Sequence, residues 1–330
     1  MKPFDFGHAD TVDGAIRTAV RTGGHYYAGG TNLLDLMKNG VEAPDVLIDI
    51  GRLGLEAITS NESGGVLIGS GATNSVVANH PLVRMQYPVL SQAILSGATT
   101  QLRNMATVGG NMMQRTRCPY FMDPAFGLCD KRLPGSGCAA RDGFNREHAL
   151  FGAGESCVAV HPSDMAVALA ILDAQVHVDG PAGSRVVPID GFFALPAGDP
   201  SRDNVLGEAE LIVGVELPPS PFAEHSWYLK VRDRHSYAFA LLSVAVGLEV
   251  VDGVIRAAAV AMGGVAAKPW RTDAVEAALV GRTPDRESFR IAARLAMAGA
   301  EPLSENGYKV DLGKHAIVRA LERASSLPND

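Results

Sequence analysis

All four cysteines of this 330-residue chain lie in one segment, between residues 118 and 157. They are Cys118, Cys129, Cys138 and Cys157. A chain of this length buries a core without disulfide staples, and Met1 is followed by no pattern typical of a secretory signal peptide. The cluster therefore predicts a metal centre rather than disulfides. Proline and glycine are frequent in the segment, so we expect an irregular insertion at about residues 115–157.

The spacing of the cysteines bears on the kind of metal. The intervals are too wide for the paired C-x₂₋₄-C of a zinc ribbon, and all-thiolate ligation is typical of iron–sulfur clusters. Lys and Arg outnumber Asp and Glu in the insertion although the whole chain has a net charge of −7, a surplus that would offset thiolate charge. Zinc remains the alternative. Because four cysteines make a complete ligand set, His148 and His161 are interpreted as solvated or hydrogen-bonded histidines.

Charge and hydropathy exclude two classes of partner. A net charge of −7 without any run of Lys and Arg argues against nucleic acid. The longest apolar stretches, Met165–Leu172 and Ala238–Leu248, are too short to span a bilayer, so no membrane span is expected.

The hydrophobic pattern predicts alternating helices and strands before residue 218. The pattern predicts a domain boundary at Pro218–Pro221, followed by a hairpin around Asp252-Gly253 and then by helices. Helices are expected at residues 11–21, 33–37, 75–79, 91–98, 163–172, 271–279, 285–299 and 312–324. Strands are expected at residues 25–28, 46–50, 66–68, 175–178, 210–217, 238–250 and 254–262.

Two glycine-rich turns are candidate anion sites. Ala28-Gly29-Gly30-Thr31-Asn32 joins a predicted strand to a predicted helix, and Thr107-Val108-Gly109-Gly110-Asn111 is a second turn of the same kind. Backbone N–H groups freed of side chains can converge there on a phosphate. Neither turn matches G-x-G-x-x-G or a P-loop. Glycine pairs that merely make turns are the alternative for either one alone.

Taken together, three motifs carry a family resemblance. The two glycine turns, followed by His161-Pro162-Ser163-Asp164 at the head of an apolar helix, resemble the FAD-binding subunit of molybdenum hydroxylases. The resemblance covers essentially the whole chain. It implies an α+β protein with a vanillyl-alcohol-oxidase-type FAD-binding domain of two α/β subdomains and a C-terminal domain of β-sheet and helices. The expected ranges are 1–54, 55–220 with the insertion, and 221–330.

The resemblance also implies roles for individual residues toward FAD. The first turn and its flanks would hold the pyrophosphate, through Tyr26, Tyr27, Ala28, Gly29, Gly30, Thr31, Asn32, Leu33 and Leu34. The second grip would come from Thr107, Gly109, Gly110 and Asn111, with Gly97 nearby. Asp164 would bind the ribityl or adenosine part, Ile212 would pack on the cofactor, and Lys230 would reach the isoalloxazine. A cation there stabilises the anionic reduced flavin; a solvated lysine is the alternative.

Within that family, the insertion resembles the one in the flavin subunit of three-subunit bacterial aldehyde oxidoreductases. That likeness implies one 4Fe–4S cluster on Cys118, Cys129, Cys138 and Cys157. It further implies a heterotrimer with a molybdopterin-binding large subunit and a 2Fe–2S small subunit. Electrons would reach the FAD here and pass to an external acceptor, and no substrate-oxidising residue is expected on this chain. The compartment is expected to be the cytoplasm, or the periplasm by co-export with a partner.

Two other functions remain open from the sequence. One is a stand-alone flavin oxidase or reductase of the same fold, and the other is a non-redox module that holds a nucleotide and zinc. Exposed-loop aromatics of the insertion (Tyr120, Phe121, Phe126 and Phe144) and the stretch Ala238–Leu248 are candidate surfaces for a partner subunit.

Overall fold

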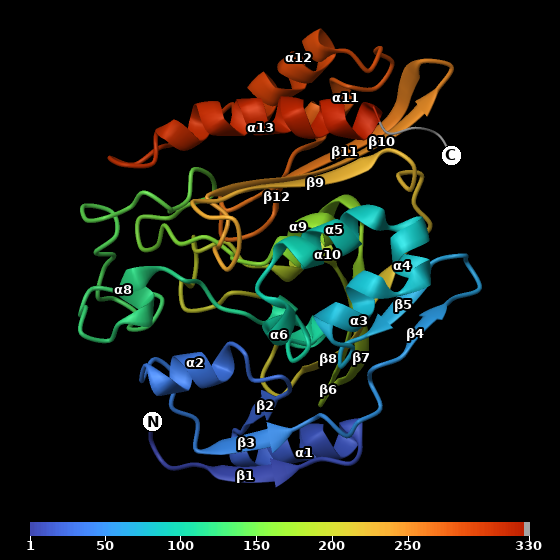
Figure 1. Cartoon of the computed structure of the whole chain (residues 1–330). Coiled ribbons are helices and arrows are strands. Elements are labelled where there is room, and N and C mark those ends of the chain that lie inside the picture. The colour runs from blue at the N-terminus through green and yellow to red at the C-terminus, as the bar shows by residue number, and fades with distance from the viewer. Residues whose placement is uncertain (327–330) are drawn as a thin grey trace.

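The computed structural model describes residues 1–326. Across these residues the strands form three sheets, stacked from the N-terminal unit at the bottom of Figure 1 to the C-terminal unit at the top. The largest apolar cluster spans the second unit and the inner face of the C-terminal sheet, and a second cluster lies between that sheet and its helices. None of the described helices is both long and apolar enough to cross a membrane.

The N-terminal unit is a small parallel sheet with two helices. Its strands lie in the order β1-β3-β2, and its elements are β1 (Asp5–His8), α1 (Val12–Thr22), β2 (His25–Tyr27), α2 (Leu33–Lys38) and β3 (Val46–Asp49). The Thr11 hydroxyl accepts a hydrogen bond from the Gly14 N–H at the start of α1, and Gly23 ends the helix with φ 65°. Both features confirm the helix predicted from the sequence. Ala15 and Ala19 of α1 pack on Ile48 of β3.

The second unit is an antiparallel sheet covered by short helices. Its strands lie in the order β4-β5-β8-β6-β7. The strands are β4 (Ile58–Ser60), β5 (Val66–Gly69), β6 (Gln175–Gly180), β7 (Gly183–Pro188) and β8 (Leu211–Leu217). The helices are α3 (Asn74–Asn79), α4 (Pro81–Gln86), α5 (Pro88–Ser96), α6 (Thr100–Arg103), α7 (Val108–Met112), α9 (Asp164–Ile171) and α10 (Ile189–Phe192).

Helix α9 joins the second unit to the third. Every residue from Met165 to Ile171 is buried, because α9 packs on α5 and also on strands β10 and β11 of the C-terminal sheet. A helix that is apolar on all sides needs neighbours on all sides. This packing fixes Asp164, at the first turn of α9, deep between the units.

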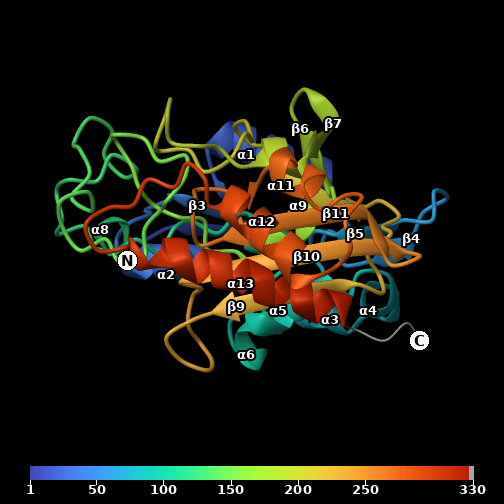
Figure 2. The same ribbon diagram turned by 90° about the horizontal axis from the view of Figure 1, so that it is seen from above.

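The C-terminal unit is a sheet with helices on its outer face, as the view from above shows (Figure 2). Its strands lie in the order β12-β11-β10-β9, all antiparallel. The elements are β9 (Ser226–Val231), β10 (Leu242–Val251), β11 (Val254–Gly263), β12 (Trp270–Arg271), α11 (Asp273–Ala277), α12 (Arg286–Ala296) and α13 (Tyr308–Ser325). Asp252 and Gly253 both have positive φ, the geometry of a type I′ turn, so the predicted hairpin is present.

Several sequence-based expectations are corrected by the structure. The second glycine turn is the first turn of helix α7, capped by the Thr107 hydroxyl. The predicted helix at 91–98 begins earlier, at Pro88, since proline fits a first helical turn, and Ala98 lies outside it with φ 52°. The stretch Ala238–Leu248 offers no partner surface over most of its length. Residues 242–248 are buried in β10, between α9 on one face and α13 on the other.

The cysteine segment, residues 115–157, is irregular as expected and is described throughout. Its helix α8 is a single turn, Pro119–Met122. Phe121, expected on the surface, is buried against Leu36 of α2 and Cys129. Phe126 and Phe144 are exposed, and Tyr120 is half-buried with its hydroxyl accepting the Phe144 N–H.

Candidate functional site

The first glycine turn follows β2 and leads into α2. Gly30 has φ 68°, and a Cβ there would lie 2.6 Å from the Tyr27 ring. A Cβ at Gly29 would lie 1.9 Å from the backbone oxygen of Met105, closer than real contacts allow. Glycine at both positions therefore lets the turn fold back on itself and pack directly on the backbone that leads into α7.

The second turn faces the first from the start of α7. The Gly110 N–H donates to the capping Thr107 hydroxyl at 3.1 Å. Apart from that hydroxyl, a Cβ at Gly110 would meet no atom within 4 Å, so it would project into open space. The missing side chain at Gly110 leaves room where a ligand could lie against the helix N-terminus.

Two cavities flank these turns and meet at them. The first, here the Tyr26 cavity, has about 1450 Å³ of open volume including its mouth, and lies between the N-terminal unit and β8. The second, the Lys230 cavity, has about 1540 Å³ and lies between α5, α9 and β9. Thr31, Asn32 and Gly110 line both cavities. The paired turns thus occupy the waist of one elongated site.

Nearly all residues predicted to bind a cofactor line this site. The Tyr26 cavity is lined by Tyr26, Tyr27, Ala28, Gly29, Gly30, Thr31, Asn32, Leu33, Thr107, Gly109, Gly110 and Ile212. The Lys230 cavity is lined by Thr31, Asn32, Gly97, Gly110, Asn111, Asp164 and Lys230. Leu34 lines neither cavity. The assignment of each residue to a part of the ligand remains a prediction.

Unpaired polar atoms point to a polar ligand in the site. Buried atoms Nδ2 of Asn32, Oγ of Ser70 and Oδ1 of Asn74 have no hydrogen-bond partner among the described residues. Asn32 lines both cavities, Ser70 the first and Asn74 the second. Buried polar groups are normally satisfied, so such a cluster along one cavity fits a bound molecule rich in hydrogen-bonding groups.

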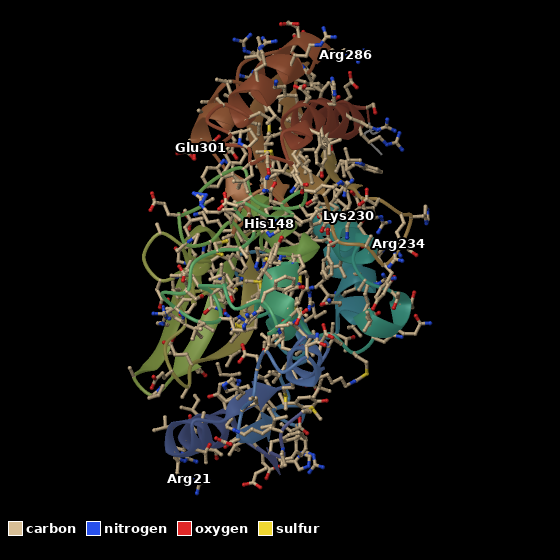
Figure 3. The ribbon with its side chains drawn as sticks, turned by 90° about the vertical axis from the view of Figure 1, so that its left-hand side faces the viewer. Arg21, His148, Lys230, Arg234, Arg286 and Glu301 are labelled. Carbon is tan, nitrogen blue, oxygen red and sulfur yellow. The ribbon has the colours of Figure 1, made fainter. Side chains whose placement is uncertain are left out.

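A buried ion pair lines the Lys230 cavity. The Lys230 ammonium lies 2.7 Å from Oδ2 of Asp164, and the Tyr228 hydroxyl donates to the other carboxylate oxygen at 2.6 Å. Burial, and then the neighbouring Asp164 charge, raise the pKa of Tyr228 well above its usual value. Lys230 also donates to the Ser96 carbonyl. The ammonium is thus fixed in place and partly compensated rather than solvated. Figure 3 shows Lys230 where the C-terminal unit meets the helices of the second unit.

Arginines add positive charge to the same cavity. Arg103, Arg117 and Arg234 line it together with Lys230, and Arg117 pairs with Asp35 as Lys230 does with Asp164. The Arg117 guanidinium lies over the Phe239 ring, 5.1 Å from its centroid, and its burial lowers its pKa. No sequence motif marks these arginines, since they are isolated basic residues far apart in the chain. The one available signal was Arg115-Thr116-Arg117 directly before Cys118.

The four cysteines line a separate, smaller cavity, here the cysteine cavity, of about 270 Å³. Cys129 and Cys138 face each other across an isolated antiparallel bridge. All four are free thiols, and they lie close enough together that charge on neighbouring cysteines adds to the rise in the pKa of Cys118 and Cys157. The structure therefore brings together every predicted metal ligand. No three His, Cys, Asp or Glu side chains in residues 1–326 converge as ligands of a single metal ion.

Burial favours the protonated forms of Cys118 and Cys157 when no metal is bound. Burial raises the pKa of Cys118 to about 12, although hydrogen bonds from the N–H groups of Phe121 and Tyr120 lower this pKa in part. It also raises the pKa of Cys157, while Lys131 lowers it. Nε2 of His148 lies 3.1 Å from the Cys118 sulfur, and burial lowers the pKa of His148 to about 4. Binding of a metal would have to release thiol protons.

Known proteins resemble this chain over its whole length. Residues 2–220 match the family described as the FAD binding domain in molybdopterin dehydrogenase, and residues 227–324 match the CO dehydrogenase flavoprotein C-terminal domain. The aldehyde oxidoreductase FAD-binding subunit PaoB of Escherichia coli K12 is 46% identical over 326 residues, 98% of this chain and 99% of that protein. The carbon monoxide dehydrogenase medium chain of Hydrogenophaga pseudoflava is 26% identical over 303 residues, 90% of this chain and 88% of that protein.

A solved structure shows the same fold. Carbon monoxide dehydrogenase from Hydrogenophaga pseudoflava, in a form that lacks the Mo-pyranopterin moiety, superimposes with a TM-score of 0.77 at 26% identity. The match covers 98% of both chains. The domain order and the sheet packing of this chain are therefore shared with a chain of that enzyme.

Proposed function

The chain belongs to the family of FAD-binding medium subunits of molybdenum hydroxylases, and from that membership we propose that it relays electrons through FAD in an aldehyde-oxidising complex. The observation that carries the proposal is the elongated site whose waist is formed by the paired glycine turns at Thr31, Asn32 and Gly110. A dinucleotide with a central pyrophosphate has this shape. When bound, FAD supplies reversible uptake and release of electrons.

The residues of the site divide between the two halves of such a ligand. Backbone N–H groups of both turns would hold the pyrophosphate, and the N-terminus of α7 would favour its negative charge. Ile212 and Tyr26 would pack on one end. At the other end, Lys230 would lie toward the isoalloxazine. Because Asp164 forms an ion pair with Lys230, Asp164 would bind the ribityl part of FAD and not the adenosine part. The ranges 1–54, 55–220 and 221–330 are proposed as the corresponding functional units.

Partner subunits complete this function. We propose a heterotrimer with a molybdopterin-binding large subunit, where the substrate is oxidised, and a 2Fe–2S small subunit that delivers electrons to this chain. PaoB is by name a subunit of an aldehyde oxidoreductase, which supports aldehydes as the substrate class. The stand-alone flavin oxidase is not favoured, since medium chains of multi-subunit enzymes match over nearly the whole length.

The cysteine cavity is proposed as the site of a 4Fe–4S cluster. Four thiols surround one cavity instead of converging on a point, which suits a cluster better than a single zinc ion. The buried Lys131 ammonium lies beside the cavity and would offset the charge of thiolate ligands. Zinc is the alternative.

An absorption spectrum with metal analysis tests both cofactors. We expect flavin bands, a broad visible shoulder that dithionite bleaches, and iron with acid-labile sulfide. Cys129→Ser should remove the iron and the shoulder, with the flavin bands as the internal reference. Zinc in the wild-type protein would exclude the cluster, and absence of flavin bands would contradict the FAD function.

Exposed apolar side chains of the cysteine segment are proposed to contact a partner subunit. Phe126, Leu128, Leu133 and Phe144 are all more than 40% exposed. Large apolar side chains exposed together in one segment support a contact with another protein. We expect the chain to be aggregation-prone when expressed alone and to oxidise aldehydes only with its partners. A soluble monomer that oxidises aldehydes unaided would favour the stand-alone oxidase.

A further inference from the structure

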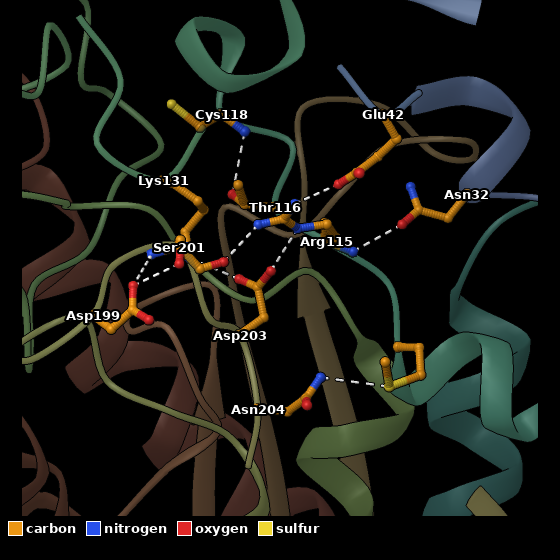
Figure 4. Close-up of polar contacts among 11 residues, drawn as sticks. Asn32, Glu42, Arg115, Thr116, Cys118, Lys131, Asp199, Ser201, Asp203 and Asn204 are labelled. Carbon is orange, nitrogen blue, oxygen red and sulfur yellow. Dashed lines mark hydrogen bonds and ion pairs between the residues drawn. The ribbon is translucent and has the colours of Figure 1, made fainter. Parts of the chain in front are cut away.

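Asp203 holds a cation on each of its two carboxylate oxygens. Nε of Arg115 lies 2.7 Å from Oδ2, and the ammonium of Lys131 lies 2.7 Å from Oδ1 (Figure 4). The side chains are largely buried, with exposed fractions of 20% for Asp203, 22% for Arg115 and 4% for Lys131. The two cations hold the pKa of Asp203 below its usual value despite its burial.

Arg115 connects Asp203 to the first glycine turn. Its backbone N–H donates to Oδ1 of Asn32 at 2.8 Å, and its guanidinium also binds Glu42 and the Ser201 carbonyl. Asn32 lines both halves of the cofactor site, and Nδ2 of the same amide is one of its unpaired buried atoms. Arg115 therefore fixes the orientation of an amide that faces the proposed ligand.

Lys131 connects Asp203 to the cysteine cavity. It lines the cysteine cavity, follows Cys129 by two positions, and lowers the pKa of Cys157. Lys131 lines neither the Tyr26 cavity nor the Lys230 cavity. An effect of Lys131 on the flavin site would thus have to pass through a neighbour.

The carboxylate between them is itself held in place. The Asp203 carbonyl accepts the Ala194 N–H at 3.1 Å, next to an isolated bridge between Phe193 and Asn204. Because both oxygens are engaged, a movement of either cation changes the hydrogen bonding of the other. Removal of one partner of a buried ion pair lowers the stability of the fold by much more than the net contribution of the pair, because the other charge stays buried without a partner.

We propose that Asp203 is a positioning residue that couples FAD binding at the first glycine turn to the order of the cysteine segment. The proposal rests on the FAD function proposed above but not on the identity of any metal. FAD that orders Asn32 would hold Arg115, Asp203 and Lys131 in their observed positions, and so reduce opening of the segment around Cys129 and Cys157.

Thiol alkylation of the full chain tests this coupling without a metal. The protein is stripped with chelator and reductant, freed of flavin, and treated with iodoacetamide with and without saturating FAD, whose binding is measured by fluorescence. Peptide mass spectrometry then gives the alkylation rate of each cysteine. We expect FAD to slow alkylation of the wild-type cysteines about 5-fold, the lower end of typical coupling between sites.

Asp203→Asn should bind FAD yet lose this protection, so that the rates with and without FAD agree. The matched control is Asp233→Asn. It breaks an exposed ion pair between Asp233, in the loop after β9, and Arg146 of the cysteine segment, and it should keep the protection. Should Asp203→Asn fail to fold, Lys131→Met, which leaves the Arg115 contacts intact, should also bind FAD without protection.

Each remaining outcome overturns a stated claim. Equal protection in wild type and in either variant, or FAD binding to wild type without any protection, would overturn the coupling alone. Loss of FAD binding in both variants, or loss of the protection in Asp233→Asn, would overturn it as well. A wild-type chain that binds no FAD would overturn the proposed function, and the coupling with it.

Discussion

The ammonium of Lys230 lies 2.7 Å from the carboxylate of Asp164, with exposed side-chain fractions of 4% and 10%. One residue comes from β9 of the C-terminal sheet and the other from the first turn of α9. The pair therefore joins two units in the wall of the Lys230 cavity. Its location sets both the stability of that junction and the charge that a bound flavin would meet.

Lys230→Met is expected to destabilise the flavin-free chain by about 3–5 kcal/mol, because it leaves the Asp164 carboxylate buried without its cation. The double variant Lys230→Met/Asp164→Asn should recover much of this loss. Urea unfolding measures both. The control is Arg286→Met, which breaks an exposed pair with Glu322 and should cost less than about 1 kcal/mol. Equal losses in the single variant and in this control would show that the Lys230 pair has no structural role.

Gly110→Val is expected to abolish FAD retention while the chain stays folded. The added side chain would enter the open space at the waist of the site, where a Cβ meets only the Thr107 hydroxyl within 4 Å. Flavin released by denaturation, together with circular dichroism, measures the two effects. Gly191→Val, at an exposed glycine of α10 with no atom within 4 Å of its Cβ, should retain flavin. Full flavin content in Gly110→Val would place the phosphates elsewhere.

Acid should destabilise the chain through His161. Burial lowers the pKa of this histidine from 6.5 to about 4, so the unfolded chain binds its proton first as pH falls. The neutral histidine contributes about 3 kcal/mol to the free energy of unfolding. This contribution is fully present above pH 6.5 and is lost progressively as the pH falls to 4. His161→Gln should flatten the pH dependence of the unfolding free energy in that window, whereas the exposed His235→Gln should not. Identical pH profiles for the wild type and His161→Gln would contradict this assignment.

Lys309 of α13 should anchor the cysteine segment to the C-terminal unit. Its fully buried ammonium donates to the carbonyls of Glu147, His148 and Gly264. Lys309→Met leaves these carbonyls unpaired, so we expect a loss of about 2–4 kcal/mol and faster hydrogen exchange near residue 148. Lys314→Met, at an exposed position of the same helix, should change stability by less than about 0.5 kcal/mol. Unchanged exchange in Lys309→Met would exclude the anchor.

The sequence predicted those parts of the site that are made of contiguous residues. Both glycine turns and the cysteine cluster were recognisable because each concentrates an unusual residue type in a short stretch. The contacts of Asp203 with Arg115 and Lys131 were not, since they join residues far apart in the chain and no motif marks them. Nor did hydropathy distinguish the buried strand β10 from a partner surface, because both are apolar; the helices that cover it decide the matter.

The most direct test of the account is the FAD content of the purified wild-type chain. The protein is denatured, and the released cofactor is identified by chromatography and quantified against protein. We predict FAD in an amount equimolar with the chain, bound through the site whose waist is Thr31, Asn32 and Gly110. Absence of FAD from the protein, even after reconstitution with excess cofactor, would contradict the account.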